Sequence, residues 1–316
     1  MSSPVGEVPG MDAGTAGKAD DVPRFMSVRQ VARYLQVNEK KIYSLVSDGD
    51  LPATKVTGKW LFPRDLVDLW LLESAHGGLL TDRLLISGSD DPLLYRLVLR
   101  VANEIQARAL ISYTATGTQL GLSLLARRRA DVCGIHWGPA EESRQRHPAL
   151  LKQYALHRDW VLVRLFLREQ GLMLAPGTAP PGGELSRLFT PETRWVSRQE
   201  GAGSQRFLQE IVSRQGLNPA ARRVAIQAYS ERDAASMIAM GHADVGTGIR
   251  AAAAEFGLDF VPIGWEAFDF AMPRGIFFRT LFQKLLEQLR GPECQRLGQM
   301  LGGYDFTDCG SLVWPV

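Results

Sequence analysis

MSVRQVARYLQVNEKKIYSLVSDGDLPATKVTGKWLFPRDLVDLW, from Met26 to Trp70, is the stretch that decides the fold of the N-terminal part of this chain. Ser27 is predicted to cap a first helix, because apolar residues recur after it at helical spacing. Asn38 is predicted to cap a second helix, and only Gln36 and Val37 separate the two. Two helices joined so closely are typical of a helix-turn-helix, whose second helix enters the major groove of DNA.

The residues that follow predict a wing. Leu51–Val56 and Trp60–Phe62 alternate like strands around Thr57-Gly58-Lys59, and Pro63 then predicts a third helix from Arg64 to Glu73. The order of these elements resembles the excisionase and MerR-like winged helix-turn-helix family, which implies double-stranded DNA as a partner. A small protein-binding winged helix with a solvated charged face is the alternative. The candidates for DNA contact lie on the second helix, the wing and the helix ends: Arg29, Lys40, Lys41, Tyr43, Ser44, Lys55, Lys59 and Arg64.

Length and composition limit the classes of protein to which this chain can belong. The chain has 316 residues, of which 45% are hydrophobic and 22% charged, with a net charge of +2, so two or three globular domains are expected. The sequence contains no apolar run of the roughly 20 residues that a membrane helix needs, and a cytoplasmic protein is expected. Its three cysteines are widely spaced, which argues against a disulfide framework or a zinc site. No metal or cofactor is expected.

Changes in sequence texture predict the domain organisation. Residues 1–23 are rich in Gly, Pro, Ala and Asp and predict a disordered leader. The winged helix-turn-helix is assigned to residues 24–75, a linker to 76–83, an α/β domain to 84–303 and a C-terminal tail to 304–316. The heptad segment through which MerR-type regulators dimerise is missing after Gly77-Gly78, so the expected homodimer must use another surface.

From Leu84 onward, short apolar runs alternate with amphipathic helices, which predicts an α/β domain. This alternation of strands and helices occurs twice, which predicts two similar lobes. The long segment Trp160–Leu174 is mainly apolar, apart from Arg164, Arg168, Glu169 and Gln170, and is predicted to cross between the lobes. Ala267–Phe278 is predicted to return the chain to the first lobe. The predicted strands are Leu84–Ser87, Ala109–Tyr113 and Asp131–Ile135 in the first lobe, then Arg194–Ser197, Asp244–Ile249 and Phe260–Ile263, while Val224–Ala228 leads to another helix.

Hydroxyl groups recur where predicted strands give way to helices, at Ser87, Ser89, Thr118, Ser204 and Ser230. Helix starts offer unpaired N–H groups and the positive end of the helix dipole, and the carboxyl ends of strands in an α/β sheet face one crevice. Each serine taken singly can be an ordinary N-cap. Their recurrence in two lobes favours a site that holds a small oxyanion. Nearby Asp90, Asp91 and Glu200 are explained as capping or solvated carboxylates.

Three segments carry a second resemblance: Arg198–Ser204, Gly241–Ile249 and Gly257–Ile263. They resemble the periplasmic-binding-protein-like domain that bacteria fuse to helix-turn-helix modules, and the domain is similar to molybdate- and tungstate-binding proteins. The resemblance implies a two-lobed, type II α/β fold and a small anionic ligand, molybdate or tungstate. The residues that it implies as ligand-binding are Ser87, Ser89, Thr118, Arg198, Ser204 and Ser230.

The chain departs from that family at two places. The pattern Gly-Ser-Gly-Thr-Arg is replaced by Gly201-Ala202-Gly203-Ser204-Gln205, with Arg206 one place later. Glu231 stands where the family often has histidine. An acidic side chain near the pocket opposes an anion, so this difference bears on the choice of ligand.

No catalytic residue is assigned, because the histidines lack metal-like spacing and no Gly-x-Ser-x-Gly elbow is present. The sequence therefore predicts a transcriptional regulator that senses a small oxyanion, and not an enzyme. Two alternatives stay open. One is an excisionase-like architectural DNA-binding protein with a ligand-free assembly domain. The other is a sensor of an organic acid, whose carboxylate Arg198 and Arg206 would suit.

Overall fold

The computed structural model describes residues 23–48, 51–75, 83–218 and 221–314. The chain forms two compact units, residues 1–80 and residues 81–316, and each is described by itself. The expected leader and linker fall almost entirely outside the described residues.

The first unit begins with the two predicted helices, α1 (Val28–Tyr34) and α2 (Glu39–Ser47). The Ser27 hydroxyl accepts the N–H of Gln30 in a capping box, and the Asn38 side chain accepts the N–H of Lys41 at 2.8 Å. Gln36 adopts a left-handed φ of 55° in the tight turn between the helices. Both N-caps predicted from sequence are therefore confirmed.

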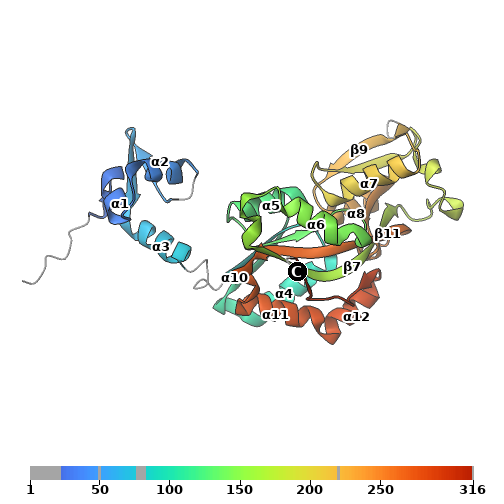
Figure 1. The fold of residues 1–316 in the computed structure, drawn as a ribbon. Coiled ribbons are helices and arrows are strands. Elements are labelled where there is room, and N and C mark those ends of the chain that lie inside the picture. Colours follow the sequence, from blue (N-terminus) through green and yellow to red (C-terminus); the bar gives the residue numbers. More distant parts are fainter. Residues whose placement is uncertain (1–22, 49–50, 76–82, 219–220, 315–316) are drawn as a thin grey trace, which may run out of the picture. The chain divides into compact units, whose positions relative to one another are not determined.

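The wing is also present. Strands β2 (Thr54–Val56) and β3 (Lys59–Pro63) form the hairpin, and helix α3 (Arg64–Ala75) follows it (Figure 1). A short strand that the sequence did not reveal, β1 (Phe25–Met26), adds to β3 and gives the order β1-β3-β2. Two residues are too few to show alternation, so sequence periodicity could not predict β1. The core beneath the wing consists of Met26, Val31, Ala32, Ile42, Leu51, Phe62 and Val67.

The second unit is built on two long antiparallel strands, β7 (Trp160–Leu174) and β11 (Asp259–Pro273), which pair along their whole length. They hold together one sheet in the order β5-β4-β6-β11-β7-β10-β8-β9. The sequence predicted the bounds of β7. It divided β11 into a strand and a separate return segment, whereas the structure has one strand with register shifts between Pro262 and Gly264 and between Phe268 and Asp269.

The first lobe lies at one end of this sheet. Helix α5 and helix α6 cover one face of it, and helices α4, α11 and α12 pack on the other (Figure 1). Its parallel strands are β4 (Arg83–Gly88), β5 (Leu110–Ala115) and β6 (Val132–Ile135). Its helices are α4 (Pro92–Ile105), α5 (Thr118–Ala126), α6 (Ser143–Leu151), α11 (Thr280–Arg290) and α12 (Pro292–Leu301).

The second lobe repeats the arrangement at the other end of the sheet. Helix α7 packs with one apolar cluster, while α8 and α9 pack in the cluster that continues from the first lobe. Its strands are β8 (Arg194–Arg198), β9 (Arg223–Ala228) and β10 (Val245–Ile249), and its helices are α7 (Gly203–Arg214), α8 (Glu231–Ala239) and α9 (Arg250–Glu255). The mixed α/β, two-lobed fold expected from sequence is thus present.

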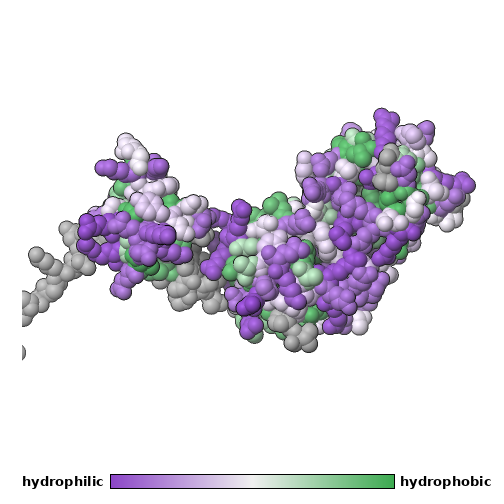
Figure 2. Space-filling model, turned by 45° about the horizontal axis from the view of Figure 1, so that its top comes forward, coloured by the Kyte–Doolittle hydropathy of each residue, from purple (hydrophilic) through white to green (hydrophobic). Residues whose placement is uncertain are grey.

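The C-terminal residues belong to the sheet. After the short helix α10 (Arg274–Phe277) and helices α11 and α12, strands β12 (Tyr304–Asp305) and β13 (Leu312–Trp314) pair with β7. The segment set apart from sequence as a tail therefore completes the domain. Among the described residues, no helix is both long and apolar enough to span a membrane. Hydrophilic residues cover most of the face shown in Figure 2, where apolar side chains appear only in small separate patches.

Candidate functional site

Two of the predicted hydroxyls in the first lobe meet each other. Ser89 follows β4 and Thr118 is the first residue of α5, and their side-chain oxygens lie 2.7 Å apart. Thr118 Oγ1 also donates to the carbonyl of His136 at 3.2 Å. Both side chains are buried. Adjacent parallel strands bring them together, because β4 pairs with both β5 and β6 and all three end at the same edge.

Two predicted residues of the second lobe also meet. Nη1 of Arg198, at the end of β8, donates to the hydroxyl of Ser204 in the first turn of α7 at 3.0 Å. Arg198 Nη2 donates to the carbonyl of Tyr229 at 3.4 Å, and both Arg198 and Ser204 are buried. Helices α5 and α7 each begin without a side-chain cap. Their first N–H groups are therefore not held by capping side chains.

The two lobes touch at this point. The N–H of Gln119 donates to the carbonyl of Gly201 at 3.3 Å. The ring of His136 lies directly against Gly203, where an added Cβ would be 1.8 Å from Cδ2 and 1.9 Å from Nε2. Only glycine fits at this position. The strand ends of the first lobe and the start of α7 in the second lobe consequently form one continuous contact.

The hydroxyls of Ser87 and Ser230 bond to other groups, although Ser230 stands between Tyr229, whose carbonyl accepts from Arg198, and Glu231. The hydroxyl of Ser87 lies within β4 and donates to the carbonyls of Gly121 and Val132 at 3.5 Å each. The hydroxyl of Ser230 caps α8 by accepting the N–H of Asp233 at 3.0 Å. Both hydroxyls have partners inside their own lobe, as do those of Ser89 and Thr118, which bond to each other and to the carbonyl of His136. Four of the six predicted ligand-binding residues, Ser89, Thr118, Arg198 and Ser204, lie at the contact between the lobes.

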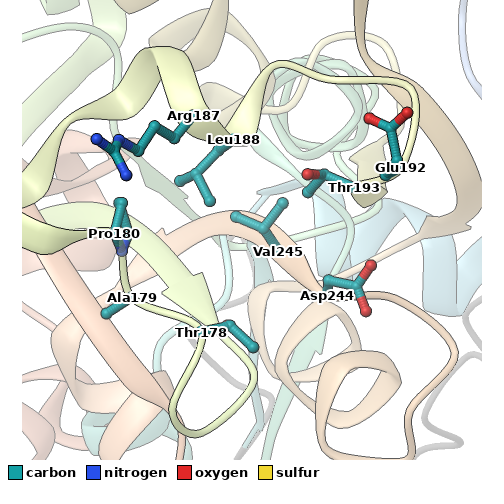
Figure 3. A pocket seen from close by; sticks show the side chains of 9 residues that line it. All are labelled: Thr178, Ala179, Pro180, Arg187, Leu188, Glu192, Thr193, Asp244 and Val245. Atoms are coloured by element: carbon teal, nitrogen blue, oxygen red, sulfur yellow. The ribbon is translucent and has the colours of Figure 1, made fainter.

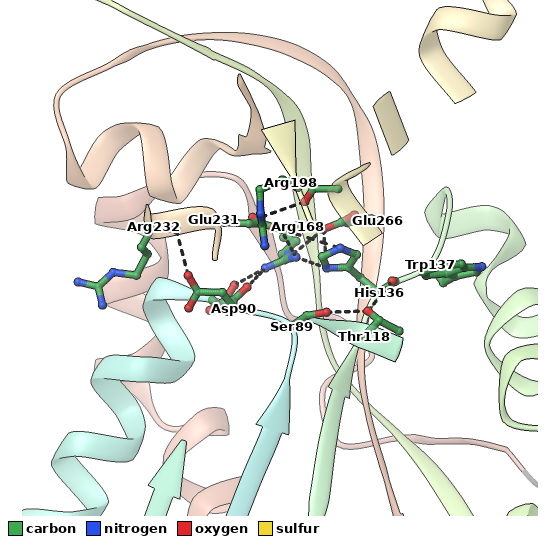
Figure 4. A network of polar contacts seen from close by, with 12 residues as sticks. Ser89, Asp90, Thr118, His136, Trp137, Arg168, Arg198, Glu231, Arg232 and Glu266 are labelled. Atoms are coloured by element: carbon green, nitrogen blue, oxygen red, sulfur yellow. Dashed lines mark hydrogen bonds and ion pairs between the residues drawn. The ribbon is translucent and has the colours of Figure 1, made fainter. Parts of the chain in front are cut away.

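A buried group of charged residues fills the space between the lobes, and we call it the interlobe cluster: Asp90, Asp91, His136, Arg168, Arg198, Glu231 and Glu266. Arg168, from the middle of β7, lies at its centre (Figure 4). Its Nε donates to Glu266 at 2.7 Å, and its Nη1 donates to the carbonyl of Asp90 at 2.7 Å and to Asp91 at 3.1 Å. Its Nη2 contacts Glu231 at 3.1 Å and donates to Nδ1 of His136.

Each lobe contributes charges to this cluster. Asp90, Asp91 and His136 come from the first lobe, Arg198 and Glu231 from the second, and Arg168 and Glu266 from the strands that join them. The N–H of Arg232, in α8, donates to Oδ2 of Asp90 at 3.0 Å and so ties the second lobe to the first. The cluster therefore depends on the closed arrangement of the lobes.

The protonation of the cluster follows from its burial. Burial raises the pKa of Glu266 to about 8, and the charges of Glu231 and Asp91 add to the shift while Arg168 opposes it. Burial likewise raises the pKa of Asp91 and that of Glu231. Glu266 is therefore largely protonated near neutral pH. This lowers the excess of negative charge that four carboxyl groups would otherwise place beside Arg168 and Arg198.

Sequence reasoning missed this cluster. Asp91 does cap α4, since it accepts the N–H of Leu94 at 2.9 Å, but Asp90 and Asp91 are buried and not solvated as expected. Glu200, the third carboxylate considered with them, is exposed. The signal in the sequence was Arg168 itself, because a charged residue within an otherwise apolar strand needs buried partners. Nothing in the spacing identified those partners.

A shallow hollow of about 370 Å³ lies elsewhere on the second lobe (Figure 3). It is lined by Thr178, Ala179, Pro180, Arg187, Leu188, Glu192, Thr193, Asp244 and Val245. One of its two acidic residues, Asp244, is already held by Arg194, whose Nη2 lies 2.6 Å from Oδ1. The hollow contains none of the predicted ligand-binding residues.

The predicted DNA-contacting residues lie on the surface of the first unit. Seven are exposed, and Arg64 is half-buried. Arg64 lies 3.7 Å from Asp68 and over the ring of Tyr34, while Lys55 lies over the ring of Trp60. No ion pair among the described residues involves Lys40, Lys41 or Lys59. These lysines on α2 and at the wing remain available to phosphates.

Comparison with known proteins identifies both units. A family model described as a PBP superfamily domain matches residues 102–290, and a helix-turn-helix domain model matches residues 25–75. The uncharacterized protein YvgK of Bacillus subtilis (strain 168) is 23% identical over 310 residues, which cover 91% of this chain and 97% of YvgK.

Solved structures are similar to the second unit. A protein of Clostridium perfringens with bound phosphate, assigned as a phosphate ABC transporter substrate-binding protein, has a TM-score of 0.52 at 12% identity, over 71% of this chain and 99% of that one. The regulatory domain of CcmR from Synechocystis PCC6803, in complex with 2-PG, has a TM-score of 0.47 at 15% identity, over 66% of this chain and 95% of that one.

Proposed function

Because the chain belongs to the PBP superfamily and joins that domain to a helix-turn-helix domain, we propose that it is a ligand-responsive transcriptional regulator of the cytoplasm. Its helix-turn-helix binds double-stranded DNA. Its two-lobed domain closes on a small oxyanion, most specifically molybdate or tungstate. It acts as a homodimer, so that closure in each protomer changes how the paired DNA-binding domains meet an operator.

The observation that supports an oxyanion is that the Ser89–Thr118 pair of the first lobe and the Arg198–Ser204 pair of the second flank the place where Gln119 bonds to Gly201 and the His136 ring lies on Gly203. Three of these four side chains are neutral hydroxyls, and they adjoin the starts of two helices that have no side-chain cap. Hydroxyls, backbone N–H groups and helix dipoles are the donors that hold a fully ionised oxyanion. A ligand-free assembly module would gain nothing from burying such donors in both lobes.

An organic acid is the second candidate ligand, and Arg198 is the observation that favours it. This guanidinium is buried beside the Ser204 hydroxyl, and a carboxylate pairs well with arginine. The surrounding carboxyl groups of the interlobe cluster weigh against a ligand of high negative charge. Titration with a short panel of anions separates the two candidates.

Regulation follows from differential binding. A ligand shifts the lobe equilibrium only by its preference for one lobe arrangement, and any effect on DNA affinity must be matched by an equal effect of DNA on ligand affinity. Both effects can be measured with the full chain, by fluorescence anisotropy of labelled DNA with and without molybdate. Light scattering measures the expected dimer.

The test of the ligand site is a thermal-shift titration of the full chain with molybdate, tungstate, sulfate and phosphate. An oxyanion present at 100 times its dissociation constant adds about 2.7 kcal/mol of stability. We expect molybdate or tungstate to raise the melting temperature of the native chain and of a Ser123→Ala control, whose hydroxyl bonds only within α5. The double variant Ser89→Ala with Ser204→Ala should fold but lose the shift.

Two results would contradict the proposal. An unchanged molybdate shift in the double variant would remove these serines from the site. No shift of the native chain with any of the four anions would remove the oxyanion itself and favour the organic acid.

A further inference from the structure

His136 occupies a position that the predicted site did not include. It follows β6 at the carboxyl end of that strand, and its side chain is buried. Its carbonyl accepts from Thr118 Oγ1, while its ring lies on Gly203 at the first turn of α7. His136 therefore adjoins Thr118, a predicted residue of the first lobe (Figure 4), and Gly203, which precedes the predicted residue Ser204 of the second.

The contact with Arg168 fixes the tautomer of this ring. A guanidinium carries N–H donors and no acceptor, so Nδ1 of His136 must accept the hydrogen bond from Nη2 of Arg168. Burial, together with the charges of Arg168 and Arg198, holds the pKa of His136 well below its ordinary value. The ring is therefore neutral, and its single proton lies on Nε2.

That proton has no acceptor in the part of the chain that the structure describes. Among the residues that the structure describes, Nε2 of His136 is a buried nitrogen without a hydrogen-bond partner. Oε1 of Glu231 is 3.9 Å away, which is too far for a hydrogen bond, and Oε2 of the same group also has no partner among the described residues. A buried donor that lacks a partner is costly, so its place at a proposed binding site needs an explanation.

We propose that His136 is a ligand-binding residue whose Nε2–H donates to an oxygen of the bound oxyanion, with Arg168 acting as the positioning residue that sets the tautomer. The inference rests on the proposed oxyanion site and deepens it. It places a neutral N–H donor beside the hydroxyls of Ser89, Thr118 and Ser204. It also gives Arg168 a role besides pairing with the buried carboxyl groups. Its guanidinium orients the His136 ring and does not contact the ligand.

A metal ion is the competing ligand for the same atoms. One ligand atom each from His136, Glu231 and Glu266 lies within 4.8 Å of the others, a spacing that could hold a cation. A metal on Nε2 would need the lone pair there and would move the ring proton to Nδ1, directly opposite the donating Arg168. Arg168 also brings a positive charge to both carboxyl groups. The tautomer therefore favours an acceptor over a cation.

Two substitutions of His136 test the roles of its two ring nitrogens separately. In His136→Gln the amide reaches the position of Nε2 and can donate there. In His136→Asn the shorter side chain can still accept from Arg168 in place of Nδ1, but no donor reaches the ligand. Molybdate binding to the full-length chain is measured by calorimetry, and we expect His136→Asn to lose about tenfold or more in affinity. His136→Gln should stay within about threefold of the native chain.

Nitrogen-15 spectra of the histidine side chains supply a readout that needs no ligand. The native chain should show the Nε2–H tautomer for the ring whose signal disappears in His136→Gln. A proton on Nδ1 would overturn the inference by itself. So would equal molybdate affinity in the native, Gln and Asn chains, and in that case the proposed oxyanion function would stand.

The remaining outcomes also discriminate. If the native chain binds none of the four anions, the proposed function fails and the ligand role of His136 fails with it. If Zn²⁺ stabilises the native chain, molybdate does not, and both variants lose the effect of Zn²⁺, the site is a metal site and the inference is overturned.

Discussion

Arg168 donates from Nε to Oε1 of Glu266 at 2.7 Å, and both side chains are buried on neighbouring strands that run through both lobes. The two residues are 98 positions apart in the chain. Their pairing sets the electrostatics of the space between the lobes, because every other member of the interlobe cluster except Arg198 contacts one of them or both. The positive charge of Arg168 should therefore stabilise the second unit, and a negative charge on Glu266 should destabilise it.

Glu266 should make the stability of the chain pH-dependent. Burial is the main cause that raises its pKa from an ordinary value near 4.5 to about 8, so the folded chain binds this proton more tightly than the unfolded chain. The stabilising contribution is fully present below about pH 4.5 and is lost as the pH rises through about 8. We expect the melting temperature to fall between about pH 4.5 and about pH 8, to level off above that, and to fall less in Glu266→Gln. Parallel profiles for the two chains would contradict this.

Arg168 should be far more important to folding than a surface arginine. Replacing it with methionine leaves Asp91, Glu231 and Glu266 buried without their shared cation, which is expected to cost about 3–5 kcal/mol in the free energy of unfolding. Arg250→Met is the matched control, because Arg250 pairs with Glu169 at a partly exposed site and should lose no more than about 1 kcal/mol. Urea unfolding followed by circular dichroism measures both. Similar losses would mean that the cluster is not the buried network described.

The contact between Gly203 and His136 predicts a steric effect on lobe closure. A Cβ on Gly203 would overlap the imidazole ring, so Gly203→Ala should destabilise the closed arrangement by about 1–3 kcal/mol and weaken molybdate binding. Gly275→Ala is the control, because nothing lies within 4 Å of its added Cβ. Thermal melts and calorimetry check the pair. Equal behaviour of the two variants would show that the ring does not pack on α7.

The DNA-binding unit yields a prediction that is independent of any ligand. Lys41→Ala on α2 and Lys59→Ala at the wing should each weaken binding to a duplex. For Lys59→Ala, the slope of log affinity against log salt concentration should fall by about 1, as expected for one lost phosphate contact. Lys152→Ala, an exposed lysine of the second unit, is the control. Fluorescence anisotropy at several salt concentrations checks this, and unchanged binding in both variants would remove α2 and the wing from the interface.

Much of the fold could be predicted from local patterns. Ser27 and Asn38 predicted their helices because capping is a matter of a few adjacent residues. The mainly apolar run from Trp160 to Leu174 was predicted to cross between the lobes, and it does so as strand β7, with the same bounds. The division of β11 had a local cause too, since Pro262 and Gly264 interrupt an otherwise continuous strand and coincide with a register shift.

The site could be predicted only in part. The rule that strand ends meet at one edge brought Ser89 to Thr118 and Arg198 to Ser204. It could not show that the hydroxyls of Ser87 and Ser230 form hydrogen bonds with partners in their own lobes. Nor could it predict the contact between Arg168 and His136. The alternation of side chains along a strand assigns a residue to one face of the sheet but does not say which distant residue it contacts.

The pairing of β6 with the last part of β11 has a consequence for synthesis of the protein. Ile135 pairs with Asp269, a residue translated roughly 130 positions later, so the first lobe is made first and its sheet is completed last. Until β11 arrives, the nascent chain presents an open strand edge at β6, and such edges recruit other chains. Products truncated within the second lobe should consequently aggregate, even though they contain every residue of β4, β5 and β6.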